Sequence, residues 1–223
     1  MTPEPIEPDP AALARRLLGQ ASGSRRIIGI CGAPGAGKST LAAQLIVALD
    51  ALSPGCAVVV PMDGFHLAAS VIGGDDRSTR RGAPDTFDPR GYAALLHRLR
   101  LNTDPIVYAP EYRREIEDPV TGAIPVPQSC RIVITEGNYL LLPDPAWRAV
   151  RQELDEVWFL EAPDEALRID RLIERHQRFG KDPARARDHV LGSDECNARL
   201  VAGHRDQADL VLRFESWHAH SGH

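Results

Sequence analysis

Aromatic residues are scarce in this chain of 223 residues: they make up 5% of it, as five Phe, four Tyr and three Trp. Aliphatic side chains must therefore fill most of the core, which is typical of buried α/β sheets. No stretch approaches the roughly 18 consecutive apolar residues that cross a bilayer, so the sequence predicts no membrane span. The length fits one large domain, or one domain with a lid.

An excess of positive charge is also missing, because the formal net charge is −5. This argues against nucleic-acid binding driven by overall positive charge. It fits an enzyme that acts on anionic ligands and keeps its positive charge local. The four cysteines are widely spaced and form no C-x-x-C pair, which favours buried thiols in a reducing compartment. We therefore expect a cytoplasmic protein without a zinc site.

The two ends of the chain differ in composition from its middle. The first residues are acidic and rich in proline, and they lack the basic start and apolar core of a secretory signal. Asp9 and Pro10 are typical of an N-cap and a first helical position, and they predict a helix over 11–18. We expect a proline-rich tail and short helix over 1–24, a main domain over 25–215 and a flexible tail over 216–223.

A glycine-rich octapeptide over 32–39, GAPGAGKS, is the most informative feature of the chain. It matches G-x-x-x-x-G-K-S, follows an apolar run over 27–31 and precedes a segment of helical spacing. Strand, glycine-rich turn and helix are the context in which this pattern cradles phosphates on backbone N–H groups. An ordinary turn with a surface lysine is the weaker alternative. The nucleotide-binding candidates are Gly32, Ala33, Pro34, Gly35, Ala36, Gly37, Lys38, Ser39 and Thr40.

Two side chains of this phosphate-binding loop (P-loop) carry specific chemistry. Lys38 is placed to reach the β- and γ-phosphates, and the Ser39 hydroxyl is placed to ligate Mg²⁺. We therefore expect ATP and Mg²⁺ as cofactors, although the loop alone does not distinguish ATP from GTP.

Segments of strand and helix character alternate along the chain. Strands are predicted over 27–31, 57–60, 131–135, 156–160 and 208–214, with a short one over 106–108. Further helices are predicted over 92–101, 145–154, 163–179 and 184–202. A loop or small hairpin is predicted over 111–128, which is charged and interrupted by proline. The alternation predicts an α/β fold, the three-layer αβα arrangement of P-loop NTPases with a parallel five-stranded sheet and a helical lid over about 175–187.

Two carboxylates follow predicted strands, where open parallel sheets bind their ligands. Asp63 follows the strand over 57–60 and is the candidate base that orients and deprotonates a hydroxyl acceptor. Because Asp-Gly pairs are frequent in turns, a turn residue is its alternative role. Glu136 ends the strand over 131–135 and is the second candidate ligand of Mg²⁺. Its alternative role is the first-turn acid of a following helix.

Four arginines share one face of the predicted helix over 163–179: Arg168, Arg171, Arg175 and Arg178. At about 100° per residue they fall within about 80° of arc. Such a face can deliver guanidinium groups to a transferring phosphate, and we take Arg175 and Arg178 as the catalytic candidates. A solvated face with ordinary i,i+4 ion pairs is the alternative.

The candidates for binding the phosphate acceptor lie between residues 66 and 112: His66, Arg81, Asp85 and Tyr112. They supply polar and aromatic groups where an acceptor pocket would form. His66 lies three residues beyond Asp63 and is as readily a structural histidine as a substrate ligand. Spacing assigns no individual role to the other three.

Together these segments resemble the P-loop kinases of the uridine kinase, phosphoribulokinase and bacterial pantothenate kinase superfamily. The resemblance is carried by GAPGAGKST at 32–40, PMDGFH at 61–66, RRGAPDTFD at 80–88, APEYRREIEDP at 109–119, ITEGNYLLL at 134–142, RLIERHQRFGKDPARA at 171–186 and SDECNARLV at 193–201. The P-loop alone is unspecific, whereas D-G-F-H and E-G-N-Y-L-L-L in this order are much more specific. Uridine kinases have an aromatic-rich base pocket after the aspartate, and this chain does not, so the resemblance does not name the acceptor.

The resemblance implies Asp63 as the catalytic base, with Lys38 on the phosphates and Ser39 and Glu136 near Mg²⁺. It implies catalytic arginines in the lid, at Arg175 and Arg178. It also suggests that Asn197 and Arg205 lie near the adenine.

From these observations we predict an ATP-dependent kinase that transfers the γ-phosphate to a hydroxyl of a small metabolite, such as a sugar, a nucleoside or a pantothenate-like alcohol. The alternative is a nucleotide-dependent regulatory ATPase or switch that acts on a protein partner. It is less favoured, since the guanine-reading motif N-K-x-D is missing from the sequence. We expect no nucleic-acid or membrane partner, and leave a homodimer open.

Overall fold

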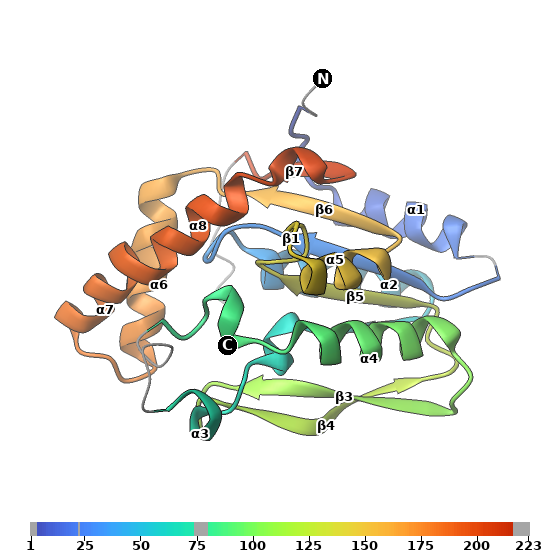
Figure 1. Cartoon of the computed structure of the whole chain (residues 1–223). Coiled ribbons are helices and arrows are strands. Elements are labelled where there is room, and N and C mark those ends of the chain that lie inside the picture. Colours follow the sequence, from blue (N-terminus) through green and yellow to red (C-terminus); the bar gives the residue numbers. More distant parts are fainter. Residues whose placement is uncertain (1–3, 22, 74–79, 216–223) are drawn as a thin grey trace.

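A five-stranded parallel sheet forms the centre of the computed structural model, which describes residues 4–21, 23–73 and 80–215. The strand order is β2-β5-β1-β6-β7, and all neighbouring strands are parallel (Figure 1). The strands are β1 (Arg26–Cys31), β2 (Ala57–Val59), β5 (Ile132–Gly137), β6 (Glu156–Glu161) and β7 (Leu210–Arg213). The predicted fold, with its parallel five-stranded sheet, is confirmed.

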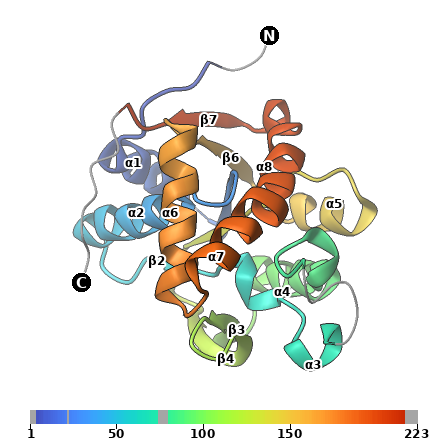
Figure 2. The ribbon, with the colours of Figure 1, turned by 90° about the vertical axis from the view of Figure 1, so that its left-hand side faces the viewer.

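Helices cover both faces of this sheet, which gives three layers (Figure 1). One face carries α1 (Pro10–Gln20) and α2 (Lys38–Leu52), and the other carries α4 (Pro89–Leu101) and α5 (Pro145–Gln152). The helices that follow β6 gather beyond the carboxyl ends of the strands, as Figure 2 shows from that side. They begin with α6 (Glu165–Arg178). Among the described residues, no helix combines the length and apolar character that crossing a bilayer requires.

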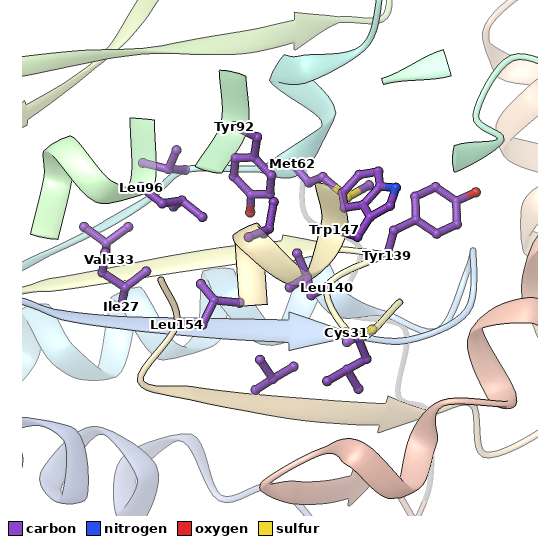
Figure 3. Packing of buried hydrophobic residues seen from close by; sticks show 14 of the residues in the cluster. Ile27, Cys31, Met62, Tyr92, Leu96, Val133, Tyr139, Leu140, Trp147 and Leu154 are labelled. Atoms are coloured by element: carbon purple, nitrogen blue, oxygen red, sulfur yellow. The ribbon is translucent and has the colours of Figure 1, made fainter. Parts of the chain in front are cut away.

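Side chains of the central strand β1 alternate between the two faces of the sheet. Ile28 packs into the cluster under α1 and α2, whereas Ile27 packs into the cluster under α4 and α5. Figure 3 shows Ile27 in that second cluster beside Val133, with Leu96 and Tyr92 reaching toward the sheet from α4. A strand buried on both faces has no solvent side, which explains its apolar, β-branched sequence.

The N-terminal helix α1 is part of the same packed structure. The Asp9 carboxylate caps it by accepting hydrogen bonds from the backbone N–H groups of Ala11 and Ala12, as the sequence predicts. Leu13 and Leu17 are buried against α2 and the sheet. The boundary near residue 24 stays a prediction, as does the flexible tail over 216–223, which lies outside the described residues.

An antiparallel hairpin stands apart from the main sheet. It consists of β3 (Ile106–Arg113) and β4 (Asp118–Pro127), with an irregular register at Pro110, which has no N–H to donate. The sequence predicts only a short strand over 106–108, so β3 is longer than expected. The hairpin is one of the two alternatives predicted for 111–128. Cross-strand pairing overrides the prolines because they lie at a bulge and on edge strands.

The predicted single helix over 184–202 consists instead of three elements. They are α7 (Pro183–His189), a π-helical turn (Val190–Asp194) and α8 (Glu195–Ala202). A π turn holds an extra residue and shifts the helical phase, so periodicity alone does not predict it. In this case the turn places the Asp194 side chain in a buried position.

We expect Leu17→Ala to lower the free energy of unfolding by about 2–5 kcal/mol, because it leaves a cavity between α1 and the sheet. Leu17 is fully buried, whereas Leu52, at the end of α2, is half exposed. Leu52→Ala is the matched control and should change stability by no more than about 0.5 kcal/mol. Urea unfolding measures both. Equal effects of the two substitutions would show that α1 is not part of the folded unit.

Candidate active site

The P-loop joins β1 to α2 at the carboxyl end of the central strand. Its glycines adopt conformations that other residues avoid: φ is +78° at Gly35 and +97° at Gly37. A side chain at position 35 would also press on α6, since its Cβ would lie 2.9 Å from Leu172 Cγ. Gly37 is the N-cap of α2 and supplies no side-chain cap. The first N–H groups of α2 are therefore left to an anion.

The Lys38 ammonium is buried and directed back onto the loop. Its Nζ donates to the carbonyl oxygens of Gly32 and Ala33, both at 3.0 Å, and to Asn138 Oδ1 at 2.6 Å. Burial lowers the pKa of Lys38, and the nearby Glu136 carboxylate opposes that shift. Three acceptors thus hold the ammonium where a phosphate oxygen can replace one of them.

Ser39 and Glu136 face each other across the end of β5. The Ser39 hydroxyl donates to Glu136 Oε1 at 2.9 Å. Burial raises the pKa of Glu136, the Asp63 carboxylate raises it further, and Lys38 opposes both. A hydroxyl oxygen and a carboxylate oxygen at hydrogen-bond distance are the hard donors that Mg²⁺ prefers. A cation placed there would remove the electrostatic cost of ionising Glu136, so these residues fit Mg²⁺.

Asp63 lies in a short 3₁₀ turn, Met62–Phe65, directly after β2. The turn packs on the hairpin so closely that a Cβ on Gly64 would overlap the Pro110 carbonyl. The Asp63 side chain is 34% exposed, and its Oδ2 lies 3.5 Å from Arg114 Nη2. Asp63 lines the same cavity, of about 170 Å³, as Lys38 and Glu136.

This cavity brings together most of the candidates from the sequence. Along its wall lie Pro34, Gly35, Lys38, Ser39, Asp63, His66, Arg81, Tyr112, Glu136 and Arg175. Five P-loop candidates do not line it: Gly32, Ala33, Ala36, Gly37 and Thr40. Outside the loop, two candidates lie elsewhere. Arg178 is exposed and does not line the cavity, and Asp85 is exposed and pairs with Arg80 at 3.0 Å.

The arginines on one face of α6 lie in different environments along the helix. Arg168, at its start, is buried and donates to the Pro34 carbonyl at 3.0 Å and to Glu165 and Glu195. It therefore clamps the P-loop to α6 and α8. Arg175, two turns later, reaches the cavity. Its guanidinium has no hydrogen-bond or ion-pair partner among the described residues, and burial and the nearby Arg114 lower its pKa.

His66 is held between two aromatic rings, 4.0 Å from Phe87 and 4.6 Å from Tyr112 between ring centroids. Its Nδ1 lies 2.8 Å from the Asp63 carbonyl oxygen, so the proton on Nδ1 is donated there. Burial lowers the pKa of His66, and the Asp63 carboxylate opposes the shift. A neutral histidine in this position fixes the turn that carries Asp63.

Several residues that line the cavity are not among the sequence candidates: Asn138, Arg114, His176, Lys181, His189 and Asp194. Asn138 and Arg114 lie inside the segments EGNY and YRR, so the resemblance offered a signal for them. The histidines and Asp194 come together only through the π turn.

The two residues that the resemblance suggests near the adenine line two different cavities. Asn197 lines the cavity and donates to the Gly82 carbonyl at 3.4 Å. Arg205 pairs with Glu161 and lines a second cavity, of about 280 Å³, between Ala33 and α8.

Known proteins with kinase names match this chain over most of its length, although no family model matches it. An "ATP-dependent kinase-like protein notR'" of Aspergillus versicolor is 36% identical over 153 residues, covering 65% of this chain and 88% of that protein. A Schizosaccharomyces pombe protein named "Putative uridine kinase C227.14" is 36% identical over 196 residues, covering 85% and 83%. The chain belongs to the P-loop kinases of the uridine kinase superfamily. As a member of this group it is an ATP-dependent kinase.

Solved structures of this kinase group agree. A structure described as a "putative fructose transport system kinase" from Silicibacter sp. TM1040 superposes with a TM-score of 0.80 at 36% identity, covering 92% of this kinase and 99% of that chain. YFH7 from Saccharomyces cerevisiae has a TM-score of 0.77 at 20% identity, covering 95% and 100%, and so shares the fold.

We expect the free energy of unfolding to fall further in the wild-type protein than in the His66→Gln variant when the pH is lowered from 7 to 5. The pKa of His66 is lower in the folded state than the ordinary value near 6.5, so its contribution is complete above that value and is lost below it. The difference between the two free energies of unfolding should change by at most about 1.4 kcal/mol per pH unit. Urea unfolding at each pH measures it. Parallel pH profiles would show that folding does not lower this pKa.

Proposed function

We propose that this kinase transfers the γ-phosphate of ATP to a hydroxyl group of a small metabolite: a sugar, a nucleoside or a pantothenate-like alcohol. The observation that carries the proposal is the single cavity shared by Lys38, Asp63 and Arg175. Phosphoryl transfer needs alignment of the reactants, neutralisation of phosphate charge and an acceptor for the hydroxyl proton. These three side chains match those needs.

In this proposal the P-loop, residues 32–40, binds the triphosphate through its backbone N–H groups. Lys38 Nζ exchanges a loop carbonyl for a phosphate oxygen while Asn138 keeps it in place. Ser39 and Glu136 hold Mg²⁺, which neutralises phosphate charge when bound. The raised pKa of Glu136 supports this assignment, because a buried carboxylate without a cation is costly.

Asp63 acts as the base. Its side chain is partly exposed to the cavity and faces the Ser39–Glu136 pair closely enough to raise the pKa of Glu136. A hydroxyl placed between Asp63 and the γ-phosphate would donate its proton to the carboxylate as its oxygen bonds to the γ-phosphorus. The bond from that phosphorus to the β–γ bridging oxygen breaks, and ADP leaves. The Arg114 guanidinium lies 3.5 Å from this carboxylate, as its ion-pair partner.

Arg175 receives the transferring phosphoryl group. A largely buried guanidinium without an acceptor among the described residues is unfavourable, and its lowered pKa reflects the cost of burial. Phosphate oxygens would supply the missing acceptors. Because the charge on those oxygens is redistributed during transfer, such a donor stabilises the transition state.

A regulatory ATPase or switch acting on a protein partner has less support. It would need the P-loop but would give no role to Asp63 in the same cavity. A metabolite panel separates the two alternatives. We expect ADP formation to rise sharply with one class of hydroxyl compound, with its phosphoester detected by mass spectrometry. Stimulation by a protein alone, without a phosphoester, would instead support the switch.

We predict that Asp63→Asn retains ATP binding and lowers the rate of phosphoryl transfer by about 10²–10⁴-fold, because the amide cannot accept the hydroxyl proton. Asp85→Asn is the matched control, since Asp85 is exposed outside the cavity. Nucleotide binding by calorimetry and turnover with a responding acceptor measure the two effects. Near-normal turnover by Asp63→Asn would remove Asp63 from the mechanism.

Arg175→Gln should lower kcat by about 10²–10³-fold with little change in KM for ATP, because the lost donor acts mainly in the transition state. Arg178→Gln, three residues further along α6, should leave kcat within about twofold because exposed charges contribute little. Steady-state kinetics of the pair decide between these positions. A larger loss from Arg178→Gln would place Arg178, rather than Arg175, at the phosphate.

A further inference from the structure

Besides Lys38 and Arg175, three cationic side chains of arginine or lysine line the cavity: Arg81, Arg114 and Lys181. We propose that they form a subsite for an ionised acid group, a carboxylate or a phosphate, carried by the acceptor itself. The inference rests on the proposed kinase function, because it concerns the molecule that receives the phosphate. It goes further by assigning that molecule to the anionic hydroxy compounds.

Among the described residues, Arg81 makes little use of its hydrogen-bond donors. Its Nη2 donates to Asp118 Oδ1 at a long 3.3 Å, and its Nε is buried without a hydrogen-bond partner among the described residues. The guanidinium carbon lies 5.6 Å from the centroid of the Tyr112 ring. This cation–π contact holds the guanidinium over the ring face, and an arginine held in place can bind an oxyanion through two N–H groups.

Arg114 comes from the turn of the β3–β4 hairpin. Within the described part of the chain, its ionic contact is with Asp63 at 3.5 Å, beyond good hydrogen-bond distance. Its guanidinium carbon lies 5.8 Å from the centroid of the Phe179 ring, at the end of α6. Arg114 therefore bridges the hairpin and the lid helices while its N–H groups stay available to a ligand.

Lys181 is held by a chain of two hydrogen bonds. Its Nζ lies 3.1 Å from His176 Nδ1, and His176 Nε2 lies 3.0 Å from Asp194 Oδ2. With the ammonium donating to Nδ1, the imidazole carries its proton on Nε2 and donates it to the carboxylate. The hydrogen bond to His176 uses one of the three N–H groups of Lys181. The other two have no hydrogen-bond partner within residues 4–21, 23–73 and 80–215, so a ligand in the cavity could accept from them.

The same pair of hydrogen bonds argues against a metal at this position. His176, His189 and Asp194 offer ligand atoms within 4.8 Å of one another. A metal-ligating histidine uses its second nitrogen to donate to an acceptor, but an ammonium has no lone pair to accept with. The cluster instead aims a positive charge at the cavity.

The balance of donors and acceptors distinguishes an acid from a neutral polyol. A hydroxyl both donates and accepts, so a polyol needs carboxylate or carbonyl partners as well as N–H donors. Of the carboxylates lining the cavity, Asp63 serves as base, Glu136 serves the cation and Asp194 is used by His176, which leaves Glu117. An ionised acid only accepts hydrogen bonds, so it matches a wall that consists mainly of donors.

The test measures binding of small acids to protein whose P-loop is already filled with Mg²⁺ and a non-hydrolysable ATP analogue. Inorganic phosphate and D-glycerate are the two probes, and glycerol is the neutral counterpart of glycerate. We expect calorimetry to detect at least one acid and not glycerol. Binding of phosphate alone assigns the subsite to phosphate esters, and binding of glycerate alone assigns it to carboxylates.

Arg81→Gln and Lys181→Gln should each weaken binding of the acid by at least about tenfold. Arg113→Gln is the control, because Arg113 is exposed beside Arg114 and pairs with Glu111. Thermal unfolding checks that the variants are folded. The inference is overturned if neither acid binds the loaded protein, or if both variants bind it as the control does.

The two proposals fail in different ways. If an acid binds as expected but the metabolite panel yields no phosphoester, the kinase assignment fails and the anion subsite stands. If a neutral alcohol is phosphorylated while no acid binds, the kinase assignment stands and the subsite is wrong.

Discussion

The buried ammonium of Lys38 is the charge around which the rest of the site is arranged. It is stable there only because Gly32, Ala33 and Asn138 accept its three protons. These acceptors come from both the P-loop and the segment after β5, which are neighbours because β1 and β5 pair in parallel. The central pairing of the sheet therefore sets the position of the charge that meets the phosphates.

The local features of the chain could be predicted well from its sequence. The P-loop and Asp63 each follow a strand and Glu136 lies at the end of one, and parallel strands bring their carboxyl ends to one edge. The capping of α1 by Asp9 was predicted because cap chemistry is local. These features depend on neighbours within a few residues, or on the regular geometry of a sheet.

The partners of side chains could not be predicted in the same way. Helical periodicity puts Arg168, Arg175 and Arg178 on one face, but it does not say how far along that face the cavity extends. In the structure the face passes from the P-loop clamp, through the cavity, to solvent at the helix end. Likewise His176, which contacts Lys181, meets Asp194 through a π turn that no pattern indicates. The roles of these residues, a homodimer and a cytoplasmic location stay predictions.

Arg168 has a mechanical consequence. One guanidinium joins the Pro34 carbonyl to carboxylates at the beginnings of α6 and α8. The guanidinium thus connects three segments, and moving any one of them away would leave the buried cation with fewer acceptors. The half of α6 beyond this clamp carries Arg175 and leads to Lys181. One buried contact between the P-loop and α6 therefore helps to set where both cations lie relative to the phosphate site.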